Sequence, residues 1–373
     1  MRPLPTAMPT RPAPTTEWVP DVLGPGFMTI TLPLGFDFEG AAMATLVAHR
    51  SAQDPELIPG TPPTAGFACL YIHGWNDYFF HREVARHVAL SGGAFYALDL
   101  RKYGRSLRPG QSPGYVTDLS AYDQDFSAAL EMIENENPGL PVIFMAHSTG
   151  GLTTALWAHR HPGRLAGLAL NSPWLAWQYQ EVSRKLARPI VSAWAWRAPR
   201  QIIPMPSDGH VYSRSLGPWR DGDLPAYLQP FADDPAVTGW DLIPQWKAPE
   251  SQPLRPAWLQ AILRGHGQVL AGLQIDCPVM VWASKRSFSG PWDPSARRAD
   301  AVLNVENIVR VAPLLGDDVT IRRFESRHDI FLSDPDVRIQ VWDSWHRWVR
   351  ATLGSNATDP TKLGSSALRA LCP

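Results

Sequence analysis

Short apolar segments recur along the chain, each about the length of one strand and each bounded by Gly, Pro or Asp. Most of them lack the alternation of polar and apolar residues that marks a strand with one face in water. A continuous apolar run is typical of a strand that is covered on both faces. We therefore expect buried strands over residues 28–32, 43–48, 67–72, 94–98, 141–146, 165–170, 278–283 and 319–324.

Helical patterns alternate with these strands. Apolar residues recur at spacings of three and four from Leu119 to Ile133, directly after Asp118, whose carboxylate is suited to cap the start of a helix. The same period runs from Val337 to Thr352. Strands that alternate with helices predict the α/β class, with a mostly parallel central sheet and helices on both of its faces.

Two stretches depart from this alternation. Seven of the 37 prolines lie within residues 1–25, where no apolar period is present, and eight of the 16 tryptophans lie between residues 173 and 274 among helical pieces. The second stretch is expected to be either a lid over a pocket or a second small core. The predicted organisation is an irregular segment (1–27), a first core part (28–172), a Trp-rich, mainly helical cap (173–274), a second core part (275–354) and a tail (355–373).

Charge and cysteine content exclude several classes of protein. The chain has 34 Lys and Arg against 35 Asp and Glu, so it lacks the basic excess expected of a nucleic-acid-binding protein. The three cysteines, Cys69, Cys277 and Cys372, form no C-x-x-C pair, which argues against a disulfide framework and a thiolate metal site. Because no secretory h-region or long apolar run is present, we expect a cytoplasmic protein without stable membrane insertion.

A candidate nucleophile lies in the sequence PVIFMAHSTGG, residues 141–151. An apolar strand here runs directly into a helix expected from Thr149 to about residue 161, and Ser148 falls on the tight turn between them. Such a turn exposes the serine hydroxyl at a helix N-terminus. The usual motif is G-x-S-x-G, and Ala146 replaces its first glycine. In isolation, a serine at this position is more typical of a helix N-cap than of a nucleophile.

Two further segments supply the groups that a nucleophilic serine needs. The sequence LYIHGW ends a strand, and the backbone N–H of Trp75 is expected to join that of Thr149 in an oxyanion hole. His73 is expected to be structural. A loop histidine, His328, follows the last predicted strand and is the candidate base, because this kind of sheet orders its triad as serine, acid and histidine.

The acid of the triad has two candidates after the strand 278–283. Asp293 lies in a Pro-Trp-Asp-Pro turn, which is a common structural use of Asp. Asp300 precedes a helix expected to begin near Val305, and we favour it because a carboxylate there can reach a ring nitrogen of His328.

Together these motifs resemble the α/β-hydrolase fold, and within it the serine-aminopeptidase-like hydrolases that include monoacylglycerol lipases and lysophospholipases. The resemblance spans about residues 28–352. It implies a triad of Ser148, Asp300 and His328, and it favours the lid interpretation of the cap. It rests on HGW (73–75), DLRKYGRS (99–106), AHSTGG (146–151), DAVLNV (300–305) and RHDIFLS (327–333).

The expected reaction is hydrolysis of a carboxylic ester through an acyl-enzyme, without a cofactor or a metal. A hydrophobic ester such as an acylglycerol or lysophospholipid is favoured because the cap offers a rigid apolar wall of indoles. The alternatives are a hydrophobic lactone as substrate, or an inactive hydrolase-fold binding protein. The oligomeric state stays open. The tryptophans expected to contact substrate are Trp174, Trp177, Trp219 and Trp246.

Overall fold

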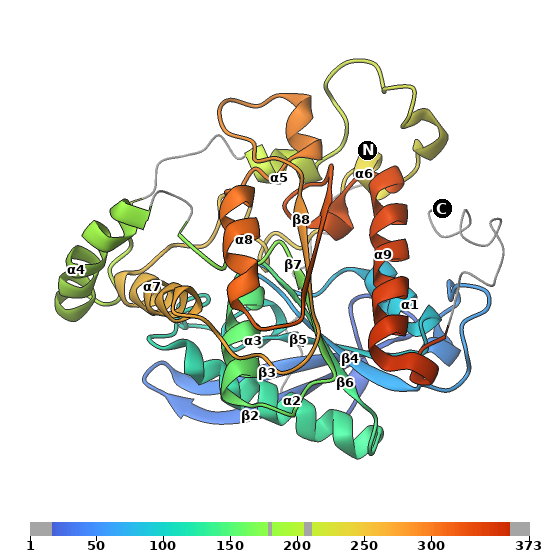
Figure 1. Cartoon of the computed structure of the whole chain (residues 1–373), viewed down its shortest axis with the longest axis horizontal. Coiled ribbons are helices and arrows are strands. Elements are labelled where there is room, and N and C mark those ends of the chain that lie inside the picture. The colour runs from blue at the N-terminus through green and yellow to red at the C-terminus, as the bar shows by residue number, and fades with distance from the viewer. Residues whose placement is uncertain (1–16, 178–180, 205–210, 359–373) are drawn as a thin grey trace.

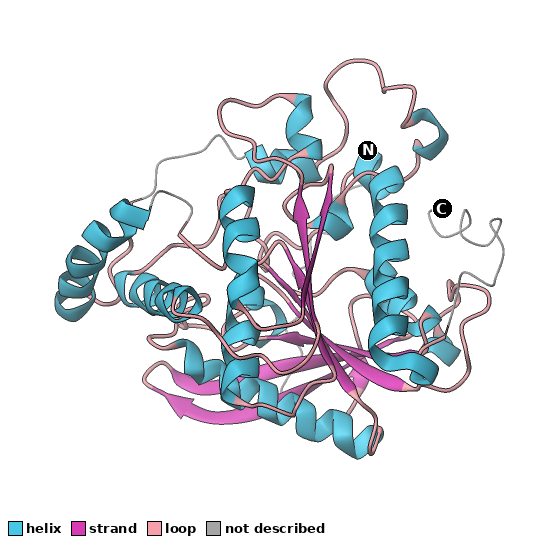
Figure 2. Cartoon of the chain, in the orientation of Figure 1, coloured by secondary structure: helices cyan, strands magenta, loops and turns pink. Residues whose placement is uncertain are grey.

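The computed structural model of the chain describes residues 17–177, 181–204 and 211–358. In this part of the chain, nine strands form one sheet in the order β1-β2-β3-β5-β4-β6-β7-β8-β9. The pairs β1/β2, β2/β3 and β3/β5 are antiparallel, and all the remaining pairs are parallel. The sheet is therefore mostly parallel, as the sequence predicts, with an antiparallel edge. Its strands form a twisted layer between helices (Figure 2).

Each of the predicted strands is present. The strands are β1 (Val19–Pro20), β2 (Phe27–Asp37), β3 (Gly40–His49), β4 (Phe67–Ile72), β5 (Gly93–Asp99), β6 (Val142–His147), β7 (Gly167–Asn171), β8 (Val279–Ser284) and β9 (Val319–Phe324). The central strands β4 to β8 are almost entirely buried, which explains why their sequences show continuous apolar runs.

Helices cover both faces of the sheet (Figure 1). One hydrophobic cluster includes Leu152 and Trp157 of α3, and a second on the opposite face includes Val88 of α1 and Trp345 of α9. The helices are α1 (Arg82–Leu90), α2 (Tyr122–Glu136), α3 (Thr149–Arg160), α4 (Glu181–Arg197), α5 (Val211–Leu216), α6 (Pro235–Thr238), α7 (Pro256–Leu270), α8 (Val305–Val311) and α9 (Pro335–Leu353).

The Trp-rich stretch lies between β7 and β8 and contains α4 to α7, with no strand among its described residues. A buried arginine connects it to the second core part. Arg297 donates hydrogen bonds to the carbonyl oxygens of Ser215, Gly217 and Ala236, at 3.0, 3.2 and 3.4 Å. The short segment before Asp300 therefore holds the stretch in place by hydrogen bonds to its backbone.

The N-terminal segment differs from the prediction of an irregular lead-in. Val19 pairs with Thr29 in a two-residue strand, and β2 begins at Phe27. Because this region is rich in proline, its sequence does not show the pattern of a strand. Pro20 is tolerated here because β1 is at the edge of the sheet, where a residue needs no second hydrogen-bond partner. Residues 1–16 and 359–373 of the predicted lead-in and tail lie outside the described residues.

Candidate active site

Ser148 forms the whole connection between β6 and α3. It has φ 52° and ψ −117°, a backbone conformation that non-glycine residues seldom adopt. A Cβ atom at Gly150 would lie 2.3 Å from the carbonyl oxygen of His73, so only glycine fits there. Ala146 is fully buried in the hydrophobic cluster, and its methyl group is accommodated where the usual motif has glycine.

Ser148, His328 and Asp300 are hydrogen-bonded in series. His328 Nε2 lies 3.0 Å from Ser148 Oγ, and His328 Nδ1 lies 2.9 Å from Asp300 Oδ2. The three side chains follow the carboxyl ends of β6, β8 and β9, which meet at one edge of a parallel sheet. This is the geometry of a nucleophile, a base and a residue that orients the base.

The two candidate acids have very different surroundings. Asp300 is fully buried, and its Oδ1 accepts hydrogen bonds from the N–H groups of Val302 and Leu303, both at 2.8 Å. These bonds fix the carboxylate while its other oxygen faces His328. Asp293 is exposed and accepts from Ser295 N–H at the start of a short helical turn, Pro294–Arg298. Of the two, the structure brings only Asp300 to the imidazole.

The loop after β4 lies against the nucleophile. A Cβ atom at Gly74 would come within 2.9 Å of Ser148 Cβ, so the backbone of the HGW segment runs directly beside the serine. Thr149 is the first residue of α3, and its N–H therefore has no acceptor within the helix. The N–H groups of Trp75 and Thr149 remain our predicted oxyanion donors.

Both ring nitrogens of His73 are hydrogen-bonded to backbone groups. Its Nδ1 lies 2.7 Å from the carbonyl oxygen of Gly74, and its Nε2 accepts the N–H of Leu100 at 3.1 Å. Burial lowers the pKa of this imidazole, which keeps it neutral. His73 thus ties the strand ends of β4 and β5 together, in agreement with the structural role expected from its position.

Aromatic side chains gather beside the serine. Trp75 and Trp258 of α7 have ring centroids 4.0 Å apart, and Trp174 lies 6.2 Å from Trp258. The backbone N–H of Trp174 also donates to the carbonyl oxygen of Ser148, at 3.0 Å. Trp75, Trp174 and Trp258 are called the indole wall below.

The other tryptophans expected to contact substrate lie in different environments. Trp246 is 2% exposed and packs edge-on against Tyr78, and the Arg105 guanidinium lies 5.1 Å from its ring. Trp219 lies against the guanidinium of Arg297, at 5.1 Å. Both indoles therefore have packing partners of their own. Trp177 is half-buried, and its carbonyl oxygen accepts from Asn307.

A buried polar cluster beside the triad was not recognised from the sequence. It consists of Asp77, His81, His147 and Asp329. Asp329 Oδ2 lies 3.3 Å from His81 Nε2 and 3.9 Å from His147 Nε2. The ring of His147 lies 4.8 Å from that of His328. Two signals were available, because His147 precedes the nucleophile and Asp329 follows the base.

Histidines in this cluster are held neutral. Burial lowers the pKa of His81 to about 4, and burial followed by the proximity of His328 lowers the pKa of His147. Asn171 donates to Asp329 Oδ1 at 2.7 Å, and its Oδ1 accepts the N–H of Ile330 at 3.2 Å. Asn171 at the end of β7 therefore fixes the loop that carries His328.

Three residues of the cluster have ligand atoms close enough together to hold a cation. Asp77, His147 and Asp329 offer ligand atoms that all lie within 4.8 Å of one another. However, Lys247 Nζ lies 2.8 Å from Asp77 Oδ1 and already compensates that carboxylate. A divalent ion would be repelled by this ammonium at short range. We assign no metal to the cluster.

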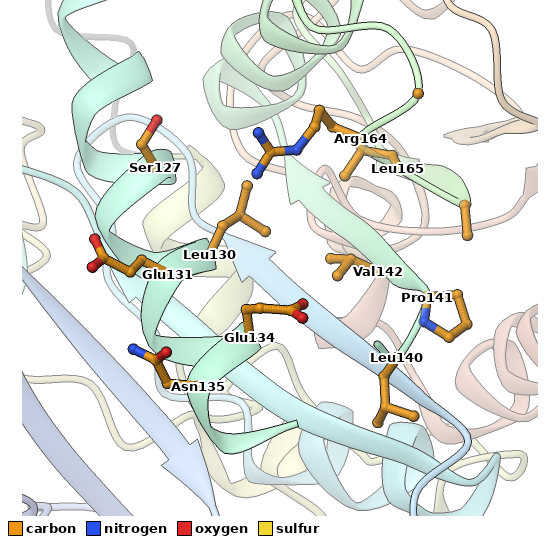
Figure 3. Close-up of a pocket in the computed structure, with 12 residues that line it drawn as sticks. Ser127, Leu130, Glu131, Glu134, Asn135, Leu140, Pro141, Val142, Arg164 and Leu165 are labelled. Atoms are coloured by element: carbon orange, nitrogen blue, oxygen red, sulfur yellow. The ribbon is translucent and has the colours of Figure 1, made fainter. Parts of the chain in front are cut away.

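A separate hollow of about 600 Å³ lies at the other end of the sheet. Its lining includes Leu130, Glu131 and Glu134 of α2, together with Val142 at the start of β6 and Arg164 (Figure 3). Because it opens at the amino end of β6, it is remote from Ser148 at the carboxyl end. The triad therefore takes no part in this hollow.

Comparison with known proteins shows that part of the chain is similar to a family of serine hydrolases. Residues 65–219 match the family described as serine aminopeptidase, S33. The chain is 31% identical to a monoacylglycerol lipase of Mycolicibacterium smegmatis over 116 residues, which are 31% of this chain and 40% of the relative. It is 30% identical to a lysophospholipase of Escherichia coli over 147 residues, 39% of this chain and 41% of the relative. The match spans less than half the length of either relative.

Solved structures share the fold over most of the chain. A carboxyl esterase of Bacillus coagulans aligns with a TM-score of 0.58 at 15% identity. The alignment covers 87% of this chain and 99% of the esterase. A monoglyceride lipase of Saccharomyces cerevisiae has a TM-score of 0.55 at 18% identity, with 95% and 99% covered. The chain therefore has the α/β-hydrolase fold, and part of its sequence is similar to a serine aminopeptidase, a monoacylglycerol lipase and a lysophospholipase.

Proposed function

We propose that this protein is a serine hydrolase that cleaves a hydrophobic carboxylic ester through an acyl-enzyme. The observation that carries the proposal is the pair of hydrogen bonds that join Ser148 to His328 and His328 to Asp300. A hydroxyl is a weak nucleophile at neutral pH, and an adjacent imidazole held by a carboxylate is the standard means of activating it.

In the proposed reaction, Ser148 Oγ attacks the ester carbonyl carbon while His328 Nε2 takes the hydroxyl proton. The carbonyl oxygen becomes an oxyanion that accepts the N–H groups of Trp75 and Thr149. The tetrahedral intermediate then collapses, and His328 gives its proton to the leaving alcohol. Water repeats the same steps on the acyl-enzyme and releases the acid. Asp300 holds the imidazole in the required tautomer and stabilises its charged form.

The indole wall supports an apolar acyl group as the substrate portion next to the serine. Trp75 is also the proposed oxyanion residue, so an acyl chain bound at the carbonyl would run directly onto indole surfaces. Large aromatic side chains offer apolar area with little loss of conformational entropy. The relatives named as monoacylglycerol lipase and lysophospholipase act, by their names, on esters with one acyl chain, and we propose the same class here.

Tyr212 is a proposed contact for the polar part of the substrate. It comes from the cap, and its ring meets that of His328 edge-on at 5.6 Å. Its hydroxyl oxygen is buried and has no hydrogen-bond partner among the residues that the structure describes. Burial raises the pKa of this phenol, so that it stays protonated and able to donate. A substrate oxygen near the leaving group would satisfy this donor.

An activity screen tests the proposed function. Purified protein is assayed on p-nitrophenyl esters of increasing acyl length, monoacylglycerols, lysophospholipids and a macrocyclic lactone, with Ser148→Ala as the blank. We expect turnover of medium or long acyl esters that the variant lacks, with a loss of at least about a thousandfold. Equal rates for the parent and the variant would contradict the proposal. A preference for the lactone would mean that the substrate is a lactone and not an acyclic ester.

A further inference from the structure

Asn76 joins the loop of the proposed oxyanion donor to the cap. Its side chain forms two hydrogen bonds with the backbone of Ala248: Nδ2 donates to the carbonyl oxygen at 2.8 Å, and Oδ1 accepts the N–H at 3.0 Å. The amide thus pairs with both backbone groups of one residue, as a residue of an adjacent antiparallel strand does. We call this pair of hydrogen bonds the Asn76 clamp. Because Asn76 directly follows Trp75, the clamp holds the chain beside the proposed oxyanion N–H.

Three further contacts join the same two segments. We call residues 75–78 the oxyanion loop and residues 243–251, which lie between α6 and α7, the cap strap. Every residue of the loop is bonded to the strap, so the two segments form one unit. The further contacts are Trp75 Nε1 to Ser251 Oγ at 3.3 Å, Asp77 Oδ1 to Lys247 Nζ at 2.8 Å, and Tyr78 Oη to the N–H of Ile243 at 2.9 Å.

Backbone strain accompanies this contact on both sides. Asn76 has φ 54° and Ser251 has φ 66°, in the left-handed region that residues with a Cβ atom seldom adopt. In the described part of the chain, five non-glycine residues have a positive φ, and Ser148 is another of them. Strained conformations persist where the surrounding contacts fix them, and they gather at functional sites. The contacts between loop and strap therefore maintain a conformation that these residues do not favour by themselves.

The N–H of Trp75 is held from both directions along the chain. On one side, Gly74 packs so closely on the nucleophile that an added Cβ atom would lie 2.9 Å from Ser148 Cβ. On the other side, the Asn76 clamp fixes the loop to the strap. An oxyanion donor stabilises the transition state best when it is aimed before the charge develops. The clamp is suited to supply this fixed aim.

The ion pair in the middle of the contact keeps the strap on the core. The side chains of Lys247 and Asp77 are 9% and 1% exposed. Movement of the strap away from the loop would break this pair and leave a buried carboxylate without its cation, which is strongly unfavourable. We therefore expect the strap to stay in place during turnover.

We propose that Asn76 is a positioning residue for ester hydrolysis, and that its clamp on Ala248 makes the cap strap a support of the oxyanion hole. The inference rests on the proposed function, because it requires the N–H of Trp75 to bind the oxyanion. It also divides the cap into two parts. Any movement of the cap that admits substrate then takes place outside residues 243–251.

Steady-state kinetics of Asn76→Gly tests the proposal. Glycine adopts φ 54° without strain, so the variant removes the two side-chain hydrogen bonds and leaves the backbone conformation accessible. We expect kcat for a p-nitrophenyl ester to fall about tenfold, since the donor is loosened but not removed. KM should change by less than about twofold, because the oxyanion forms only in the transition state.

Asn137→Gly is the matched control. The Asn137 side chain donates to Tyr96 Oη at 2.7 Å. Asn137 lies just before β6, at the opposite end of that strand from Ser148. This variant also loses an amide hydrogen bond, but it should retain the parent kcat.

A boronic acid gives a readout that a general loss of stability does not change. Its boron accepts the Ser148 oxygen and becomes a tetrahedral anion, while the hydroxyl proton passes to His328. The resulting adduct resembles the oxyanion intermediate, so its affinity reports on the hole. We expect Ki to rise about tenfold in Asn76→Gly, in parallel with the fall of kcat, and to stay at the parent value in Asn137→Gly.

Hydrogen exchange separates failure of this inference from failure of the proposed function. Asn76→Gly should increase exchange in the peptides that cover residues 74–79 and 243–251 together, whether or not an ester is hydrolysed. A protein that shows this joint increase but has no esterase activity would refute the proposed function and leave the clamp intact. Parent values of kcat and Ki in Asn76→Gly would overturn the inference, as would an increase of exchange that is confined to the loop.

Discussion

His328 Nε2 lies 3.0 Å from Ser148 Oγ, although 180 residues separate the two along the chain. This distance is within the range of a hydrogen bond before any substrate is present. The imidazole is fixed from the other side by Asp300, 2.9 Å from Nδ1. The base is therefore oriented by the fold itself, which is the condition for efficient proton transfer from the serine.

Replacement of the two candidate acids should give opposite results. Asp300→Asn keeps the shape of the side chain but lets it donate to His328, which favours the wrong imidazole tautomer. We expect kcat for a p-nitrophenyl ester to fall by about ten-thousandfold. Asp293→Asn should retain the parent rate because Asp293 is exposed and its carboxylate accepts the N–H of Ser295 within its own turn. Loss of activity in Asp293→Asn with an active Asp300→Asn would reverse our assignment.

Gly74→Ala should reduce activity much more than stability. The added methyl group would lie 2.9 Å from Ser148 Cβ and 3.1 Å from the ring of His147, so the loop must shift away from the nucleophile and move the Trp75 N–H with it. We expect kcat/KM to fall by about a hundredfold, the cost of one misplaced oxyanion donor. Gly217→Ala is the control, because its nearest neighbour lies at an ordinary 3.4 Å. Equal rates in both variants would argue against the Trp75 N–H as an oxyanion donor.

The free energy of unfolding should decrease as the pH falls from about 6.5 toward 4. Burial lowers the pKa of His81 to about 4, whereas an unfolded imidazole titrates near 6.5. In this window the unfolded chain binds the proton and the folded chain does not, so protonation favours unfolding. Between these two pKa values, His81 makes the free energy of unfolding fall by about 1.4 kcal/mol for each pH unit. Urea unfolding at several pH values measures this slope, which His81→Gln should make shallower; an unchanged slope would count against the assignment.

Arg105→Met should destabilise the fold strongly. The buried guanidinium pairs with Asp21 at 2.7 Å and with Asp99 at 2.9 Å, and the variant leaves both carboxylates without their cation. Breaking a buried pair in this way costs about 3–5 kcal/mol, measurable as a shift of the urea midpoint. Arg347→Ala, which removes an exposed ion pair with Asp343, should cost less than about 1 kcal/mol. If both variants lost a similar free energy of unfolding, the burial of Arg105 would not explain how much its ion pairs contribute to stability.

The sequence predicts those strands and helices that are determined by residues close together in the chain. The central strands were predicted because burial on both faces requires continuous apolar runs, and the β4 and β9 boundaries agree with the prediction. The helix that begins after Asp118 was predicted from its cap, and the structure shows this side chain accepting the N–H of Ser120, at the start of a short turn that leads into α2. The short edge strand at Val19 was missed because its pairing with β2 leaves no local pattern.

Other features depend on contacts between distant segments. The sequence left two candidate acids because both follow the same strand, and only the three-dimensional structure shows which carboxylate meets His328. The polar cluster around Asp329 was missed because its members come from separate loops. Trp246 and Trp219 were expected to face substrate on composition alone, but their positions beside Arg105 and Arg297 depend on how the cap folds onto the core.

Covalent labelling tests the central claim most directly. The parent protein and the Ser148→Ala variant are incubated with a fluorophosphonate probe, digested, and analysed by mass spectrometry. The account predicts one adduct, on the peptide that contains Ser148, and none in the variant. A parent protein that stays unlabelled while it is folded, or a label on a different serine, would contradict the assignment of Ser148 as the activated nucleophile.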